Sequence, residues 1–127
     1  MAKRLSLLNR LTASAENLDA AELAELVEAK SCCPVSELRQ GESRQVVGRI
    51  RSVAYVPSET VPTLEAKLYD GTDTLHLIWL GQRRIPGIEP GRRVVARGRV
   101  GEHNGRLAMY NPWYQLLPSA SEAASHG

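Results

Sequence analysis

From Gly41 onward, apolar and polar residues alternate along the chain. A period of two is typical of β-strands that bury one face. Two dipeptides, Asp70-Gly71 and Asn104-Gly105, separate pairs of such stretches, and both favour tight hairpin turns. The alternation predicts five strands, at about 43–56, 64–69, 74–80, 92–100 and 106–117. These strands fill residues 39–118, which we therefore expect to form a single all-β domain.

Glycines lie inside the first and fourth predicted strands, at Gly48 and Gly98. An interior glycine marks a bulge or a sharp bend, which a closed sheet of five strands requires. The connection 81–91 contains two Pro-Gly pairs and is too broken for a helix. An immunoglobulin-like sandwich is the alternative, but it needs about seven strands. The pattern therefore favours a five-stranded OB-fold barrel with Greek-key connections.

Residues 1–38 precede the barrel and include an acidic helix at about residues 17–30. Apolar residues recur there with helical spacing, at Leu18, Leu23, Leu26 and Val27. Asp19 and Glu22 have the spacing of a capping box, and Pro34 ends the pattern. A helix with one apolar stripe needs a surface to pack on. We favour its own barrel as that surface, with a partner protein as the alternative.

Several classes of protein are disfavoured by the remaining sequence. The chain of 127 residues has no apolar run near the roughly 18 residues that span a membrane, and no signal peptide, so a cytoplasmic location is expected. Cys32 and Cys33 are adjacent and the three His residues are scattered, which disfavours a metal site and a catalytic triad. We therefore expect no enzyme activity, cofactor or small-molecule substrate. Residues 119–127 are small and polar, as in a disordered tail.

Charge is segregated along the chain although the net charge is only +2. Residues 14–38 carry six acids against one Lys, and residues 39–118 carry twelve basic residues against seven acids. Thirteen of the sixteen basic residues are Arg, which a GC-rich genome alone would favour. The positions of the Arg residues, rather than their number, therefore carry the information.

Several runs resemble bacterial OB-fold nucleic-acid-binding domains. They are VVGRIRSV at 46–53, LYDGT at 68–72, LIWL at 77–80 and VARGRV at 95–100. The run MYNPWY at 109–114 looks like the last strand of the wedge domain of the DNA helicase RecG, and RRIPGIEPG at 83–91 is similar to a family of small stand-alone bacterial OB-fold proteins. The likeness covers about residues 38–118. It implies a barrel that binds single-stranded or junction nucleic acid, DNA ahead of RNA, without catalysis. Because no G-x-x-x-x-G-K-[ST] motif occurs, a helicase-like role would need another protein's motor.

Alternation places several Arg side chains outside the barrel. On the first strand these are Arg49 and Arg51, and on the fourth Arg97 and Arg99. The resemblance implies that these two strands are neighbours, so the four residues would form one exposed basic patch. Such a patch suits the phosphates of a nucleic acid. The alternative is that these Arg residues merely solvate a surface strand.

A second group of candidates lies on the second and third strands, the usual OB binding face. Lys67, Tyr69 and His76 point outward there, whereas Trp79 is expected inside, and one ring of the pair Trp113 and Tyr114 is expected to pack inward. The remaining candidates come from the Pro/Gly connection and from the turn before the last strand, and they are Arg83, Arg84, His103 and Arg106.

Only six aromatic residues occur, so the sequence predicts electrostatic binding with modest base preference. The resulting hypothesis is a nucleic-acid-binding OB-fold protein. The alternative is a protein adaptor that docks a partner through the acidic helix and the barrel surface.

Overall fold

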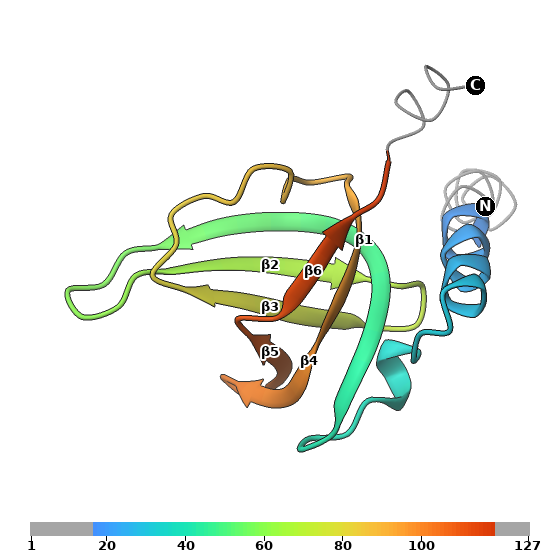
Figure 1. Ribbon diagram of the computed structural model, residues 1–127, viewed down its shortest axis with the longest axis horizontal. Coiled ribbons are helices and arrows are strands. Elements are labelled where there is room, and N and C mark those ends of the chain that lie inside the picture. The colour runs from blue at the N-terminus through green and yellow to red at the C-terminus, as the bar shows by residue number, and fades with distance from the viewer. Residues whose placement is uncertain (1–16, 119–127) are drawn as a thin grey trace, which may run out of the picture.

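The computed structural model describes residues 17–118 (Figure 1). A helix over residues 17–29 leads into a short 3-10 helix, η1 (Val35–Glu37). The strands that follow are β1 (Ser43–Val56), β2 (Thr63–Tyr69), β3 (Thr74–Leu80), β4 (Arg93–His103), β5 (Arg106–Tyr110) and β6 (Trp113–Leu116). Both the predicted tail at 119–127 and residues 1–16 lie outside the described residues. No helix of the described part is long and apolar enough to span a membrane.

The strands close into a ring in the order β1-β2-β3-β5-β4, and β4 pairs back onto β1 (Figure 1). β3 and β5 run parallel, and the other neighbouring strands of the ring run antiparallel. A bulge in β1 between Ile50 and Ser52 bends this long strand so that it can pair with both β2 and β4. The prediction of an all-β, OB-like barrel preceded by a helix is confirmed.

The predicted fifth strand at 106–117 is divided into β5 and β6, a feature that the alternation did not indicate. Asn111 adopts a positive φ of 49°, and Pro112 follows it. The Asn111 side-chain oxygen accepts the Leu80 N–H at 2.9 Å, and the Asn111 N–H donates to the Ile78 carbonyl at 2.7 Å. The break lets β5 and β6 pair with successive parts of the same edge of β4.

Apolar side chains from the strands and from two segments outside them form one core. Residues that alternate with the outward arginines of β1 and β4 are buried, with Val46, Ile50 and Val94 fully so. Two pieces outside the strands join the same core, namely Val35 and Leu38 at η1, and Ile85 and Ile88 in the 81–91 connection. Trp79 is buried as expected. The Tyr114 ring packs edge-on against it, with the two ring centroids 5.7 Å apart, whereas Trp113 is exposed.

Asp70 fastens η1 to the β2–β3 turn. The residue is only 1% exposed. It accepts the backbone N–H groups of Val35 at 2.7 Å, Thr72 at 2.9 Å and Asp73 at 3.2 Å, and the Thr72 hydroxyl at 2.6 Å. The predicted turn residue thus also connects η1 to the barrel.

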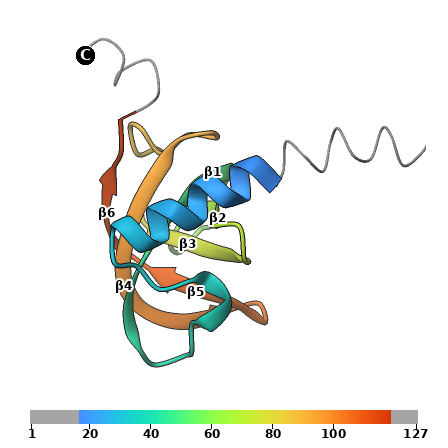
Figure 2. The ribbon, with the colours of Figure 1, turned by 90° about the vertical axis from the view of Figure 1, so that its right-hand side faces the viewer.

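The acidic helix packs on its own barrel, over the outer side of β1 and β4 (Figure 2). Leu23 is fully buried, and Leu26 and Val27 pack against a small cluster that contains Val47 and Val95. Of the two surfaces considered for this helix, the barrel is therefore the one it uses. The capping-box prediction is wrong, because Asp19 lies within the helix rather than at its start.

Gly48 occupies a position in β1 that leaves no room for a side chain. A Cβ built there would lie 2.5 Å from the Tyr69 carbonyl oxygen and 2.9 Å from its carbonyl carbon. Because these are backbone atoms, they cannot turn away. We expect Gly48→Ala to lower the free energy of unfolding by about 1–3 kcal/mol, measured by urea denaturation. Gly101→Ala is the control, since its Cβ would meet only the Ala108 carbonyl oxygen at 3.9 Å. Equal stability of the two variants would contradict the prediction.

Candidate nucleic-acid interface

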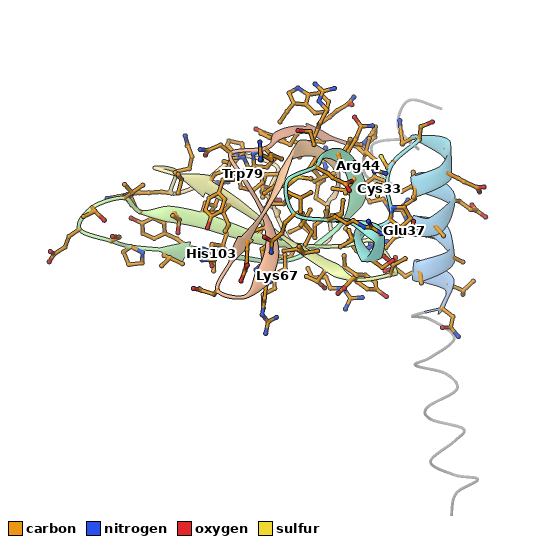
Figure 3. All side chains as sticks on the ribbon, turned by 90° about the horizontal axis from the view of Figure 1, so that it is seen from below. Cys33, Glu37, Arg44, Lys67, Trp79 and His103 are labelled. Carbon is orange, nitrogen blue, oxygen red and sulfur yellow. The ribbon has the colours of Figure 1, made fainter. Side chains whose placement is uncertain are left out.

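Six of the predicted site residues gather on the outer side of β2, β3 and β5 and on the segments beside them. We call this surface the β2–β3–β5 face. Strand register sets it, because Lys67 lies directly opposite His76, and His76 pairs in turn with Ala108 of β5. Lys67 and His103 both point to the same side of the barrel in Figure 3. The six residues are Arg51, Lys67, Tyr69, His76, His103 and Arg106.

Arg51 and Tyr69 form a stacked pair at one side of this face. Arg51 is the residue that the bulge in β1 turns out of the ladder, and it is exposed. Its guanidinium lies 3.8 Å from the centroid of the Tyr69 ring, and the Tyr69 hydroxyl donates to the Gly71 carbonyl at 3.3 Å. One face of the Tyr69 ring is therefore already covered by a cation. The planar guanidinium, rather than the ring beneath it, is the surface on which a base can stack.

His76 lies between two cationic side chains. Its pKa is lowered, first because the ring is partly buried, and then because Lys67 and Arg106 repel the added charge, while Glu65 opposes the shift. Beside it lies a shallow hollow of about 350 Å³, lined by Asp73, Thr74, His76, Gly105, Arg106 and Leu107. The face thus combines fixed positive charge with an imidazole that is held largely neutral at pH 7.

His103 holds the β4–β5 hairpin against β2. Its Nε2 lies 3.0 Å from a Glu65 carboxylate oxygen, and its Nδ1 lies 2.7 Å from the Tyr110 hydroxyl oxygen. The His103 and Tyr110 rings also pack edge-on, with their centroids 5.8 Å apart. Sequence reasoning missed Glu65 and Tyr110, since only the pairing of the strands brings them to this His. Glu65 is an acid on a basic face, and one of its carboxylate oxygens is already in contact with His103.

The basic patch predicted from Arg49, Arg51, Arg97 and Arg99 is divided in the structure. In the β1–β4 ladder Arg49 lies opposite Arg93, whereas Arg97 lies opposite Gln45 and Arg99 opposite Ser43. Between these rows, Val47 and Val95 lie under the helix. Arg97 packs over the Trp113 ring at 4.5 Å, away from the β2–β3–β5 face.

Arg83 and Arg84 lie in the connection that follows β3, apart from the other candidates. Both are exposed, and the guanidinium of Arg83 lies 5.8 Å from the centroid of the Tyr55 ring near the end of β1. The structure therefore does not join this pair to the β2–β3–β5 face.

Metal-binding and nucleophilic groups do not assemble in the described part of the chain. Across residues 17–118, no group of three or more His, Cys, Asp and Glu side chains is placed to hold a metal ion. Cys32 and Cys33 are free thiols, and burial raises the pKa of each, which disfavours the reactive thiolate.

Comparison with known proteins identifies a fold relationship but no family. No family model matches the chain, and no curated protein matches it. Among solved structures, RecG bound to a three-way DNA junction is similar, with a TM-score of 0.57 and 24% sequence identity. The match covers 72% of this chain but only 13% of the RecG chain. The protein therefore shares a RecG-like barrel fold.

Proposed function

We propose that this protein binds nucleic acid through the β2–β3–β5 face, with single-stranded or junction DNA as the favoured ligand. The observation that carries the proposal is the position of Lys67 and Arg106 beside His76, with Arg51 stacked on Tyr69 of the same strand as Lys67, while the nearby acid Glu65 is held by His103. The similar RecG structure contains a DNA junction, which supports DNA as the ligand class. No helicase activity is proposed, since the match covers so little of RecG.

The chemistry of the face suits a phosphate backbone more than a particular base sequence. Lys67 and Arg106 are exposed cations, and neutralising phosphates with such groups releases counterions and gives most of the affinity. Arg51 adds a plane on which one base can stack. Binding of this kind is strong at low salt and tolerant of sequence.

The test is a set of fluorescence anisotropy titrations with the unsubstituted protein. The ligands are single-stranded DNA, duplex DNA, a forked DNA and single-stranded RNA, each at a low and at a physiological salt concentration. We expect the single-stranded and forked DNA to bind more tightly than the duplex and the RNA, and every affinity to fall steeply with salt. Failure of all four ligands to bind at low salt would refute the proposed function.

Binding of DNA is also expected to strengthen as the pH falls. Burial, Lys67 and Arg106 lower the pKa of His76 in the free protein, so the ring takes up a proton only at acid pH. A phosphate beside His76 favours the charged form and raises that pKa, so binding takes up a proton. We expect the affinity to rise several-fold between about pH 7.5 and about pH 5.5. The His76→Gln variant lacks this titrating ring, so its affinity should change less with pH. If it kept the full pH dependence, the assignment of the effect to His76 would be wrong.

A protein adaptor that docks through the acidic helix has less support. The apolar residues that a partner would need are already covered, because Leu23 is fully buried and Leu26 and Val27 pack against Val47 and Val95 of the barrel. On the helix Leu18 remains as a large exposed apolar residue, which is too little for a stable interface.

A further inference from the structure

Two arginines face each other on the outer side of the barrel, under the N-terminal part of the helix. Arg49 of β1 and Arg93 of β4 are direct partners in the antiparallel ladder, and the side chain of each is 31% exposed. Like charges at directly opposed positions destabilise a sheet. The pair therefore needs anions close by.

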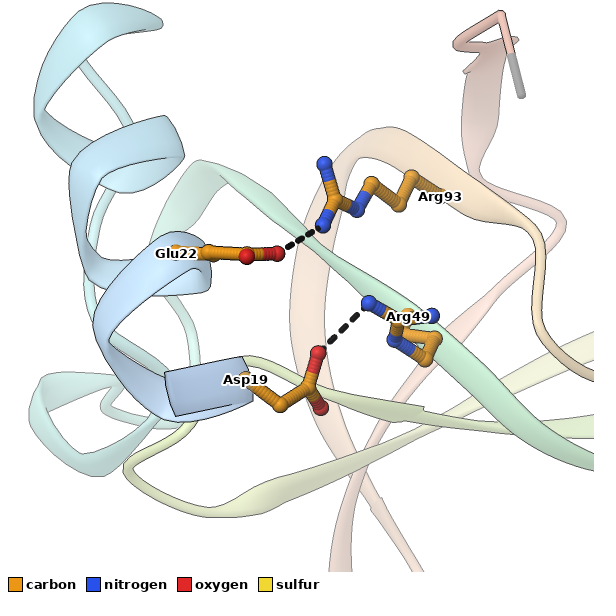
Figure 4. Close-up of polar contacts among 4 residues, drawn as sticks. All are labelled: Asp19, Glu22, Arg49 and Arg93. Carbon is orange, nitrogen blue, oxygen red and sulfur yellow. Dashed lines mark hydrogen bonds and ion pairs between the residues drawn. The ribbon is translucent and has the colours of Figure 1, made fainter. Parts of the chain in front are cut away.

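The helix supplies two carboxylates to this pair (Figure 4). Asp19 Oδ1 accepts from an Arg49 Nη at 2.5 Å, and Glu22 Oε2 accepts from an Arg93 Nη at 2.7 Å. Residues three apart share one face of a helix, so the two carboxylates are presented side by side. The buried Nε of Arg49 has no acceptor among residues 17–118, so Asp19 satisfies this guanidinium incompletely.

The arginine pair borders the β2–β3–β5 face. Across the β1–β2 ladder Arg49 lies opposite Tyr69, and the Tyr69 ring carries the guanidinium of Arg51. A nucleic-acid strand that follows the face past Arg51 therefore meets Arg49, and then Arg93, as the next cations.

The carboxylates can leave the arginines without loss of the helix from the barrel. The apolar anchor of the helix is centred on Leu23 and continues toward its C-terminal end, with Leu26 and Val27. Glu22 is not part of that anchor, and its side chain is 58% exposed. A rotation of two side chains would free both guanidinium groups.

We propose that the Arg49–Arg93 pair is a second phosphate-binding site and that Asp19 and Glu22 stand in for phosphate until nucleic acid displaces them. This inference rests on the proposed function. It makes the acidic helix a competitor within the same chain, so that weak polyanions are excluded and only a nucleic acid also held by the β2–β3–β5 face reaches the pair.

The test compares two double variants of the same helix that remove the same charge. Asp19→Asn with Glu22→Gln frees the arginine pair, whereas Glu25→Gln with Glu28→Gln changes exposed acids elsewhere on the helix. We expect the first variant to bind a fluorescently labelled oligothymidylate about three- to tenfold more tightly at low salt, and the second to bind within about twofold of the unsubstituted protein. Addition of Arg49→Gln and Arg93→Gln should abolish the gain. Equal gains in the two variants, or a gain that survives loss of both arginines, would overturn the inference.

A second measurement needs no substitution. In the unsubstituted protein, the Nε–H resonances of Arg49 and Arg93 should shift when oligothymidylate is added, and that of exposed Arg39 should not. Unchanged Arg49 and Arg93 resonances at saturating ligand would overturn this inference while leaving the proposed function intact. Absence of binding by every variant would instead refute the proposed function itself.

Discussion

Replacement of Asp70 by Ala is expected to lower the free energy of unfolding by about 3–5 kcal/mol, the largest stability loss that we predict for this protein. The carboxylate is buried and accepts four hydrogen bonds, three of them from the backbone of Val35, Thr72 and Asp73. Without it these donors lose their acceptor in a place that water reaches poorly. Urea denaturation followed by the fluorescence of buried Trp79 would measure the loss.

Two companion variants separate the hydrogen bonds of Asp70 from its charge. Asp70→Asn keeps one acceptor oxygen and is expected to have intermediate stability, because its amide NH₂ would face either the Val35 N–H or the donors of the turn. Asp73→Ala is the matched control, since among residues 17–118 the exposed Asp73 side chain accepts only the N–H of the next residue, Thr74. If Asp70→Ala and Asp73→Ala proved equally stable, the role assigned to the buried carboxylate would be wrong.

The barrel could be predicted from sequence because its signals are local. Alternation distinguishes the two faces of each strand, and the Asp70-Gly71 and Asn104-Gly105 turns mark where strands reverse. The division of the last strand at Asn111 could not be predicted in the same way. It depends on hydrogen bonds to Ile78 and Leu80, which come from a strand some thirty residues earlier. The role of Asp70 as an acceptor for Val35, 35 residues away, was hidden for the same reason.

The candidate interface could be predicted only in part, because alternation gives the face of a residue but not its neighbours. Lys67 and His76 were expected to point outward, and their direct pairing follows from a short hairpin. The partner of Arg49 depends instead on the offset between β1 and β4, which the sequence does not contain, and the structure gives Arg93 rather than Arg97. The ion pairs of the acidic helix join residues 30 and 71 positions apart, so no local pattern indicates them.

Loss of the three cations of the β2–β3–β5 face is expected to have the largest effect on binding. The triple variant Arg51→Ala, Lys67→Ala and Arg106→Ala should bind single-stranded DNA at least about tenfold more weakly at low salt. Each phosphate contact on a single strand contributes about 0.7 to the slope of log affinity against log salt, so three lost contacts should make the slope shallower by about 2. Anisotropy titrations at several salt concentrations measure both quantities.

The control for this variant removes three positive charges elsewhere, with Lys30→Ala, Arg39→Ala and Arg44→Ala. These residues are exposed and lie outside the β2–β3–β5 face. Long-range attraction depends on net charge, so it weakens by the same amount in both triple variants. The number of phosphates in direct contact with the protein falls only in the variant that lacks Arg51, Lys67 and Arg106. The slope of log affinity against log salt therefore distinguishes direct phosphate contacts from long-range attraction better than the affinity itself does. An equal change of slope in the two variants would show that the protein attracts DNA through its overall charge and would remove the basis for siting the interface on this face.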